Sequence, residues 1–234
     1  MEKIVSEAID VSLKTLSRSE WDVLPLPFPN VAEQKAIAVF LDTQCSKIDS
    51  IITELEQQIE ILKQYKTSLI TETVTKGLNK SAPMKDSGIN WIWKIPVHWE
   101  VKRLKYIINL KSGDSLTNEL LTYDDTLYPV FGGGELMGYY DKSNVASGIV
   151  LIDRVGANCG CITKLTRKSW ATDNALIVNS NENLNYIYFL LLSANLNNMR
   201  DTNAQPLIVA SKVLNFELPF CGDARRTKNH SNLP

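Results

Sequence analysis

An uninterrupted heptad pattern over residues 41 to 76 is the feature that most constrains how this chain can fold. Its seam positions alternate in steps of four and three residues, the spacing that keeps one narrow stripe of a helix facing a partner helix. The flanking positions are mostly charged or polar, so the rest of the helix is expected to face water. We predict pairing through the seam residues Leu41, Ile48, Ile52, Leu55, Ile59, Leu62 and Leu69, and the same seam also contains Cys45 and Lys66.

The length of this helix favours a spacer over an ordinary core helix. At about 1.5 Å per residue it reaches roughly 50 Å, longer than a small domain is wide, whereas helices in globular domains average about three to four turns. Asn30 can cap the helix, and Glu33 completes a capping-box pattern. We expect a helix from about Val31 to Lys76, with Thr43 as a point where it could break and Gly77 as its stop signal.

Composition indicates an intracellular protein of one or two parts. The 234 residues suffice for one large domain, or for a medium domain with an extension. The four cysteines show no pairing pattern and Cys45 lies on the helical seam, so reduced thiols are the simpler interpretation. No apolar run approaches the roughly 20 residues of a membrane span, and the amino terminus lacks the features of a signal peptide. We therefore expect a cytoplasmic protein that does not contact a membrane.

Charge is balanced throughout. The net charge is −1, and residues 84 to 220 contain 13 Lys or Arg against 13 Asp or Glu. A protein that binds nucleic acid by itself usually has an excess of positive charge, because neutralising phosphates supplies most of the non-specific affinity. If this chain binds DNA, its basic residues must cluster in space or another chain must supply much of the phosphate contact.

The second half of the sequence predicts a strand-rich body. Residues 79 to 90 read as a polar linker, and three tryptophans between Trp91 and Trp99 are expected to anchor a new core. Residues 184 to 198 look helical. The fold class is therefore α+β, a long coiled-coil-type helix attached to a mixed, strand-rich α/β body. Strands are expected at Leu104 to Leu110, Leu127 to Phe131, Gly148 to Asp153, Cys161 to Leu165 and Ala175 to Val178.

A series of short motifs runs through residues 24 to 105. It includes Leu24-Pro25-Leu26-Pro27-Phe28-Pro29, then Ala32-Glu33-Gln34 and Phe40-Leu41-Asp42, then Leu69-Ile70-Thr71-Glu72 through Gly77-Leu78, Met84-Lys85-Asp86-Ser87-Gly88-Ile89, and His98-Trp99-Glu100-Val101. Leu26-Pro27-Phe28 recurs as Leu218-Pro219-Phe220. Together these motifs resemble the specificity subunit of type I restriction-modification systems, closely over residues 24 to 105 and loosely over 106 to 220.

The resemblance implies a role for each segment. In that family two target-recognition domains each read half of a split DNA site, and two long antiparallel helices fix their spacing. The corresponding division is 1–30 as the end of a first recognition domain with a Pro-rich connector, 31–78 as the spacer helix, 79–220 as a target-recognition domain and 221–234 as an irregular tail. Because a second helix does not follow residue 220, we expect a half-length or truncated form that could dimerise through its long helix.

The function implied is non-catalytic, sequence-specific recognition of double-stranded DNA. Methyltransferase subunits would dock on the long helix, and a restriction/translocase subunit would join through the complex, so this chain itself would need no cofactor and no metal. The alternative is a coiled-coil interaction protein whose degenerate recognition domain no longer binds DNA.

Motifs for intrinsic catalysis are incomplete. Phe131-Gly132-Gly133-Gly134-Glu135 resembles the cofactor loop of adenine methyltransferases but lacks the last glycine, and Glu217-Leu218-Pro219-Phe220 lacks the first proline of their catalytic motif. We therefore expect a glycine turn followed by a strand or turn with exposed aromatics. Cys159-Gly160-Cys161 supplies too few ligands for a closed zinc site, which needs about four, and structural cysteines in a strand are the preferred interpretation.

Candidate DNA contacts come from loops in which basic and amide side chains alternate with apolar anchors. Arg can read guanine and Asn or Gln can read adenine, whereas Lys more often neutralises phosphate. Solvated surface turns are the alternative for each of them. The apolar run from Tyr186 to Leu192 is predicted to be core helix and not a base-stacking platform. The candidate residues are Lys111, Ser112, Arg154, Asn158, Lys164, Arg167, Lys168, Asn203 and Gln205.

Overall fold

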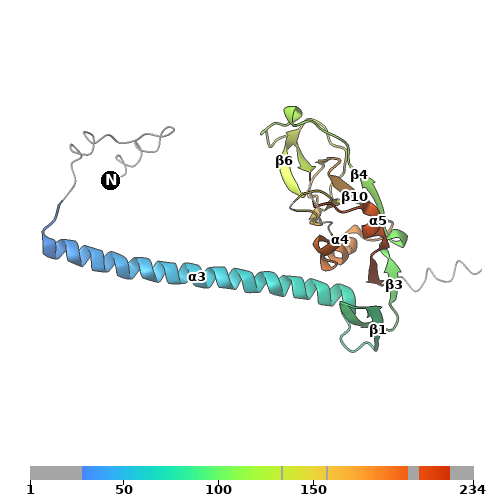
Figure 1. Cartoon of the computed structure of the whole chain (residues 1–234), viewed down its shortest axis with the longest axis horizontal. Coiled ribbons are helices and arrows are strands. Elements are labelled where there is room, and N and C mark those ends of the chain that lie inside the picture. The colour runs from blue at the N-terminus through green and yellow to red at the C-terminus, as the bar shows by residue number, and fades with distance from the viewer. Residues whose placement is uncertain (1–27, 133, 157, 200–205, 222–234) are drawn as a thin grey trace, which may run out of the picture. The chain divides into compact units, whose positions relative to one another are not determined.

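The computed structural model of the chain describes residues 28–132, 134–156, 158–199 and 206–221 (Figure 1). The chain divides into two compact units, Met1–Ile59 and Glu60–Pro234. In the first unit the described residues, 28–59, form the first part of a long helix and the short segment that caps it. The second unit contains the last turns of that helix and a strand-rich body.

Helix α3 (Val31–Lys76) is continuous over 46 residues, as the sequence predicts. The Asn30 side chain accepts a hydrogen bond from the Glu33 amide at 3.0 Å, which satisfies one of the free donors at the helix start. No break occurs at Thr43, whose hydroxyl donates to the Val39 carbonyl one turn earlier. The helix ends at Gly77, which has a φ of +76° and therefore takes the left-handed conformation that glycine tolerates best.

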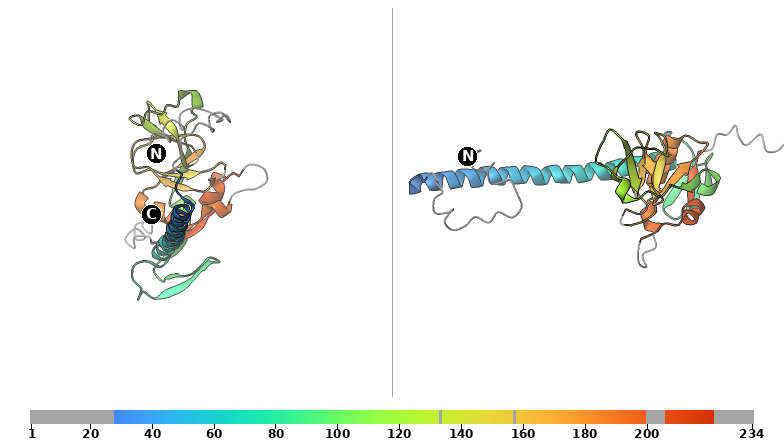
Figure 2. Two further views of the ribbon diagram at one scale, coloured as in Figure 1. Left: turned by 90° about the vertical axis from the view of Figure 1, so that its left-hand side faces the viewer. Right: turned by 90° about the horizontal axis from the view of Figure 1, so that it is seen from above.

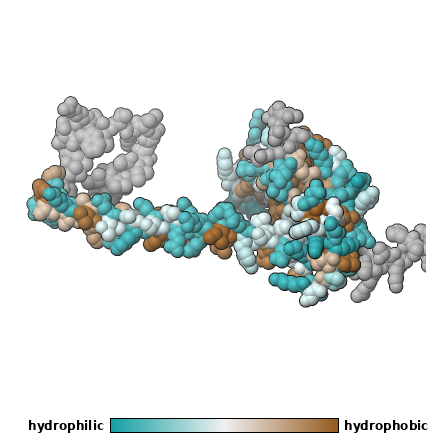
Figure 3. All heavy atoms as spheres, turned by 60° about the horizontal axis from the view of Figure 1, so that its bottom comes forward, coloured by the Kyte–Doolittle hydropathy of each residue, from teal (hydrophilic) through white to brown (hydrophobic). Residues whose placement is uncertain are grey.

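The seam of α3 is exposed along most of its length. The only buried residues of the helix are Val74 and Thr75, in the last turn. Figure 3 shows apolar patches alternating with hydrophilic surface along the helix. The predicted pairing residues Leu41, Ile48, Ile52, Leu55, Ile59, Leu62 and Leu69 are 48% to 64% exposed.

Residues 79 to 90 are not simply a linker, and that prediction is wrong for their second half. Strand β1 (Met84–Ile89) pairs antiparallel with β2 (Ile92–Pro96) in a two-stranded hairpin. The polar composition that suggested a linker fits a strand whose residues are mostly exposed. A hairpin of two strands has one face in solvent, so polar residues are tolerated there.

The three tryptophans do not act together as a core anchor. Trp99 is buried, but Trp91 is 43% exposed and Trp93 is 82% exposed. Trp91 stacks on Phe216 with ring centroids 6.2 Å apart. In β2 the buried positions are instead Ile92, Ile95 and Pro96, whereas Trp93 lies on the exposed side of the hairpin.

The predicted strand from Leu104 to Leu110 is interrupted. Strand β3 (Glu100–Arg103) pairs antiparallel with β11 (Glu217–Phe220), and a 3₁₀ turn η1 (Leu104–Tyr106) follows. The turn lets Leu104, Ile107 and Ile108 enter the core together, which alternation along one strand would not allow.

A four-stranded antiparallel sheet forms the centre of the body, with strand order β4-β10-β7-β8. The predicted strands at Gly148 to Asp153, Cys161 to Leu165 and Ala175 to Val178 correspond to three of its members. The strands are β4 (Asn109–Ser112), β10 (Ala175–Asn179), β7 (Val150–Asp153) and β8 (Ile162–Lys164).

The two faces of this sheet bury separate apolar clusters. Val150, Ile152 and Val178 belong to the larger cluster, which includes Ile187 and Leu191 of helix α4 (Leu184–Ser193). The alternate residues of the same strands, such as Leu151 and Ile177, belong to a smaller cluster. Side chains alternate between faces along a strand, so near-continuous apolar runs are expected where both faces are covered.

A three-stranded sheet with order β6-β5-β9 supplies Phe131 and Ala171 to the smaller cluster. The glycine motif predicted as a turn before a strand lies between its first two members. Tyr139 and Tyr140, predicted to be exposed, are half-buried. The strands are β5 (Tyr128–Gly132), β6 (Glu135–Tyr140) and β9 (Trp170–Ala171).

The helical prediction for residues 184 to 198 is too long. Helix α4 ends at Ser193, and Asn195 has a φ of +45° before the 3₁₀ turn η3 (Leu196–Met199). The prediction of core and not stacking surface is confirmed, because Ile187, Leu190 and Leu191 are buried. Two short elements complete the described body, α5 (Ala210–Asn215) and the 3₁₀ turn η2 (Asn118–Leu120).

The α+β class is therefore confirmed, with a long helix followed by strand-rich structure (Figures 1 and 2). None of the described helices combines the length and apolar content that crossing a membrane requires.

Candidate nucleic-acid interface

One end of the four-stranded sheet brings together four of the candidate residues. Because neighbouring strands are antiparallel, the last residues of β4 and β7 lie at the same end as the first residues of β10 and β8. Ser112 and Asp153 end their strands there. Lys111, Ser112, Arg154 and Asn158 therefore belong to the same region, which we call the loop end of the sheet.

The loop after β7 is tied to the segment that precedes α5. Val155 and Leu207 form an antiparallel bridge. The Gly156 amide donates to the Pro206 carbonyl at 3.0 Å, and the Ile208 amide donates to the Arg154 carbonyl at 2.9 Å. Asn203 and Gln205 lie outside the described residues, but the chain that follows them joins the Arg154 loop directly.

Asn158 is held by an acidic side chain from another sheet. Its Nδ2 donates to Oε1 of Glu135 at 2.6 Å, and both residues are accessible to solvent. Glu135 begins β6, directly after the glycine turn. The pair therefore fixes one amide hydrogen of Asn158, while its other polar atoms keep the capacity to contact a ligand.

Two buried polar atoms in this region have no hydrogen-bond partner among the described residues, Oδ2 of Asp153 and Nε of Arg154. Asp153 is only 1% exposed, and its Oδ1 accepts a hydrogen bond from the Val155 amide at 3.1 Å. Burial raises the pKa of the Asp153 carboxyl, and the Glu135 carboxylate raises it further. The pKa of the Cys161 thiol is also raised, first by burial and then by Asp153.

The loop after β4 is fastened to the strand region around β9. The Ser112 hydroxyl donates to the Asp173 carbonyl at 3.1 Å, and Nδ2 of Asn144 donates to Oδ2 of Asp114 at 2.9 Å. A Cβ atom on Gly113 would lie 2.3 Å from the carbonyl oxygens of Ala171 and Thr172. Ser112 thus has a structural partner, whereas the Lys111 side chain is exposed.

The remaining described candidates lie elsewhere. Lys164 is exposed at the far end of β8, and Lys168 is exposed in the following loop. Both terminal nitrogens of Arg167 donate to the Asp125 carbonyl, at 3.2 and 3.1 Å, and its guanidinium lies 5.6 Å from the centre of the Tyr139 ring. Arg167 therefore has a structural role in holding a turn, and it is less available than Lys168.

Sequence reasoning missed a polar cleft of about 630 Å³ beside the loop end. Asn118, Tyr123, Glu135 and Asn174 line it together with Met137. Tyr123 is 98% exposed. The polar stretch from Asp114 to Thr126 could have indicated this cleft, since amide and aromatic side chains in an exposed loop suit base contacts. Only the folded structure shows that this stretch faces Glu135.

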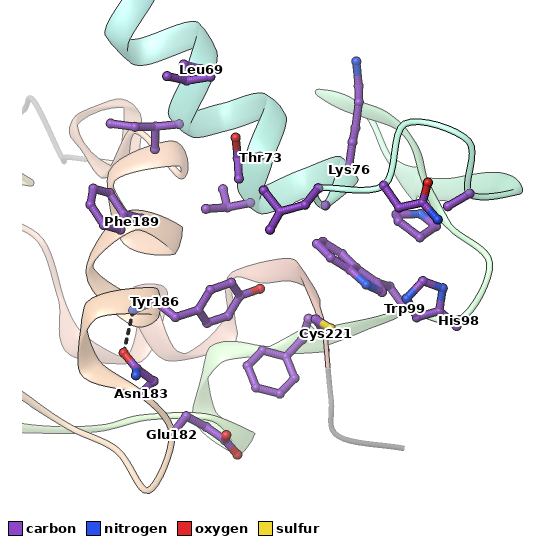
Figure 4. Close-up of a pocket in the computed structure, with 18 residues that line it drawn as sticks. Leu69, Thr73, Lys76, His98, Trp99, Glu182, Asn183, Tyr186, Phe189 and Cys221 are labelled. Carbon is purple, nitrogen blue, oxygen red and sulfur yellow. Dashed lines mark hydrogen bonds between the residues drawn. The ribbon is translucent and has the colours of Figure 1, made fainter. Parts of the chain in front are cut away.

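A second, apolar hollow of about 790 Å³ lies in the Glu60–Pro234 unit, beside the last turns of α3. Figure 4 shows Leu69 and Thr73 on one side and Tyr186 and Phe189 of α4 on another, with Trp99 near the helix end. His98 is exposed beside Trp99.

The cysteines do not lie within a strand as expected. Cys159 is buried in the turn between β7 and β8, and Cys161 directly precedes β8. Within the described ranges no three His, Cys, Asp or Glu side chains gather in a group that could hold a metal ion.

The family of the chain follows from comparison with known proteins. The family model described as type I restriction modification DNA specificity domain matches residues 96–220, which comprise more than half of the chain and nearly the whole body. The chain belongs to the type I restriction-modification specificity family. This confirms the resemblance noted from the motifs.

Curated relatives agree with this assignment. The MjaVIII specificity subunit of Methanocaldococcus jannaschii is 30% identical over 108 residues, which are 46% of this chain and 24% of that protein. The EcoBI specificity subunit of Escherichia coli is 36% identical over 103 residues, 42% of this chain and 22% of that protein. The matched segments therefore span about a quarter of each relative.

Two solved structures share the fold. The S subunit of a type I restriction-modification system from M. genitalium superposes with a TM-score of 0.51 at 20% identity, covering 62% of this chain and 37% of that chain. A chain from a structure on complex assembly and conformational transition of the type I system superposes with a TM-score of 0.58 at 15% identity, covering 94% of this chain and 55% of that one.

Proposed function

We propose that the chain is the non-catalytic, sequence-specific DNA-recognition component of a cytoplasmic type I restriction-modification complex. Residues 79–220 would read a half-site, and the spacer helix in residues 31–78 would dock methyltransferase subunits, through which a restriction/translocase subunit joins. The observation that carries this proposal is the family match over 96–220, the same residues that build the loop end of the sheet.

The loop end supports base reading by its chemistry. Arg154 and Asn158 are the residue types that can hydrogen-bond guanine and adenine edges. They lie in a loop fixed by the Val155–Leu207 bridge, and Glu135 orients Asn158. A fixed loop with adjustable side chains suits recognition, because less conformational freedom is lost on binding.

Lys111, Lys164 and Lys168 suit phosphate contacts. All three are exposed, and none has an ion-pair partner among the described residues. Balanced charge over residues 84 to 220 means that these lysines supply only part of the phosphate contact. The methyltransferase subunits would supply the rest, together with the methyl-donor cofactor.

The decisive experiment uses the chain in complex with its methyltransferase subunits. Methylation sequencing of cells with and without the chain identifies a target, and a duplex carrying that target is compared with a scrambled duplex at moderate salt. We expect much tighter retention of the target. Equal retention of both would support the alternative, an interaction protein that no longer binds DNA.

A further inference from the structure

The hydrogen bond between Glu135 and Asn158 places a carboxylate at the loop end of the sheet, where the proposed function expects DNA. Nδ2 of Asn158 donates to Oε1 of Glu135 at 2.6 Å, and Glu135 has no ion-pair partner among the described residues. An unpaired carboxylate repels the phosphates of DNA. It is therefore useful at such a surface only when it accepts a hydrogen bond from a base or holds a side chain that reads one.

Both partners of this hydrogen bond belong to packed backbone. The Asn158 carbonyl accepts a hydrogen bond from the Cys161 amide at 2.9 Å, which closes the turn between β7 and β8. Glu135 begins β6 directly after Gly134, and a Cβ atom on Gly134 would lie 3.6 Å from Oδ2 of Asp153 at the end of β7. The turn that carries Glu135 therefore packs on the strand that leads to Asn158, and little conformational freedom is lost when the two side chains meet a ligand.

The Glu135 carboxylate determines which way round the Asn158 amide lies. An amide has an oxygen that accepts hydrogen bonds and a nitrogen that donates two hydrogens, and a half turn about its last bond exchanges their places. Nδ2 must face Oε1 of Glu135, because Oδ1 in that position would bring two acceptors together. Oδ1 and the second hydrogen of Nδ2 are left side by side, and this pair matches N6 and N7 of adenine.

We propose that Glu135 is a positioning residue that makes Asn158 select adenine over guanine at one place in the half-site. In this arrangement Oδ1 of Asn158 accepts from the N6 amine of adenine, and Nδ2 donates to N7. Guanine carries the acceptor O6 where adenine carries its amine, so Oδ1 would meet a second acceptor. The inference rests on the proposed function and deepens it, because it names the base that Asn158 reads and the residue that sets this choice.

Glu135→Gln tests this choice because it keeps the size of the side chain and adds a donor. A glutamine accepts through Oε1 or donates through Nε2, so the Asn158 amide can lie either way round. In the reversed orientation Nδ2 donates to O6 of guanine. Glu119→Gln is the matched control. It removes the same charge from an exposed glutamate of η2, whose neighbour Asn118 lines the same cleft as Glu135, whereas the Asn158 amide bonds to Glu135.

The experiment uses the complex with methyltransferase subunits and the target duplex defined by methylation sequencing. Each adenine of the target is replaced in turn by guanine, with the opposite strand changed to match, and competition binding gives the ratio of the two affinities. In the native complex one replacement should cost about tenfold or more, and Asn158→Ala should remove that cost. Glu135→Gln should reduce the cost to about threefold or less, whereas Glu119→Gln should leave it unchanged.

The ratio of affinities separates the orientation of Asn158 from folding, because a smaller fraction of active complex lowers both affinities equally. The proposal is overturned if no adenine preference disappears in Asn158→Ala, or if Glu135→Gln keeps the native preference. Equal loss in Glu135→Gln and Glu119→Gln also overturns it. In each of these cases the proposed function stands as long as the native complex prefers its target to scrambled DNA. Equal retention of both duplexes by the native complex would instead refute the proposed function, and this inference with it.

Discussion

Val155 and Leu207 pair as an isolated antiparallel bridge that joins the loop after β7 to the segment before α5. Residues about 50 positions apart in sequence are thereby neighbours. The bridge places Arg154 beside the segment from Pro206 to Ile208.

Arg154→Ala should reduce binding of the target duplex by about tenfold or more, because a base-reading Arg contributes roughly 1–3 kcal/mol. Binding to scrambled DNA should change little. Competition binding by the complex with methyltransferase subunits measures both, with Lys94→Ala on the exposed side of β2 as a control. Equal loss on target and scrambled DNA would assign Arg154 to phosphate contact.

Lys168→Ala should weaken binding to target and scrambled DNA alike. A lysine that neutralises one phosphate contributes about one unit to the slope of log affinity against log salt. Titrations between low and moderate salt should therefore show a shallower slope for this variant. An unchanged slope would place Lys168 away from the DNA.

Asn158→Asp should lower target affinity more than Asn158→Ala. The aspartate would place a second carboxylate about where Nδ2 now meets Glu135 at 2.6 Å, and the two charges would repel. Adding Glu135→Gln should recover part of the affinity, since the amide can again donate a hydrogen bond. If the double variant binds no better than Asn158→Asp, the Glu135 contact does not position the loop.

Gly113→Ala should destabilise the body by about 3 kcal/mol, because overpacking costs roughly 1–3 kcal/mol and more where backbone must move. The new Cβ would lie 2.3 Å from two backbone carbonyl oxygens. Gly148→Ala is the matched control. Gly148 has a φ of +81°, but an added Cβ would meet no atom within 4 Å, so only backbone strain of about 1 kcal/mol is expected. Denaturant unfolding compares the two variants.

Asp153→Asn should reduce the pH dependence of stability. The pKa of Asp153 is raised above 3.8 in the folded state by burial, so the folded chain retains a proton that the unfolded chain has released. Its contribution to stability is complete below that value and is lost as the pH rises through the folded pKa. Thermal unfolding at pH 4 and pH 7 should therefore differ less in the variant than in the native chain.

The long helix, expected from about Val31 to Lys76, could be predicted from sequence, although the break allowed at Thr43 does not occur. Heptad spacing, the Asn30 cap and the Gly77 stop are local signals, and local hydrogen bonds alone determine where α3 begins and ends. The strands predicted at Gly148 to Asp153 and Ala175 to Val178 were also visible, with ends one or two residues from those of β7 and β10, because both faces are covered and the apolar runs are continuous. The predictions for Trp93 and for Met84–Ile89 were wrong. Both belong to a two-stranded hairpin, and which face of a hairpin is buried depends on tertiary contacts that the local sequence does not show.

The sequence alone therefore determined the family, the long helix and the residue types proposed as candidates for DNA contact. Tertiary structure decided which of those residues meet: Arg154 and Asn158 gather with Lys111 at one end of the sheet, while Arg167 is taken up by the Asp125 carbonyl. The physical reason is distance along the chain. The ends of a helix are determined by contacts within about four residues. The Glu135–Asn158 hydrogen bond and the Val155–Leu207 bridge join segments far apart in sequence, which come together only when the two faces of the central sheet are packed.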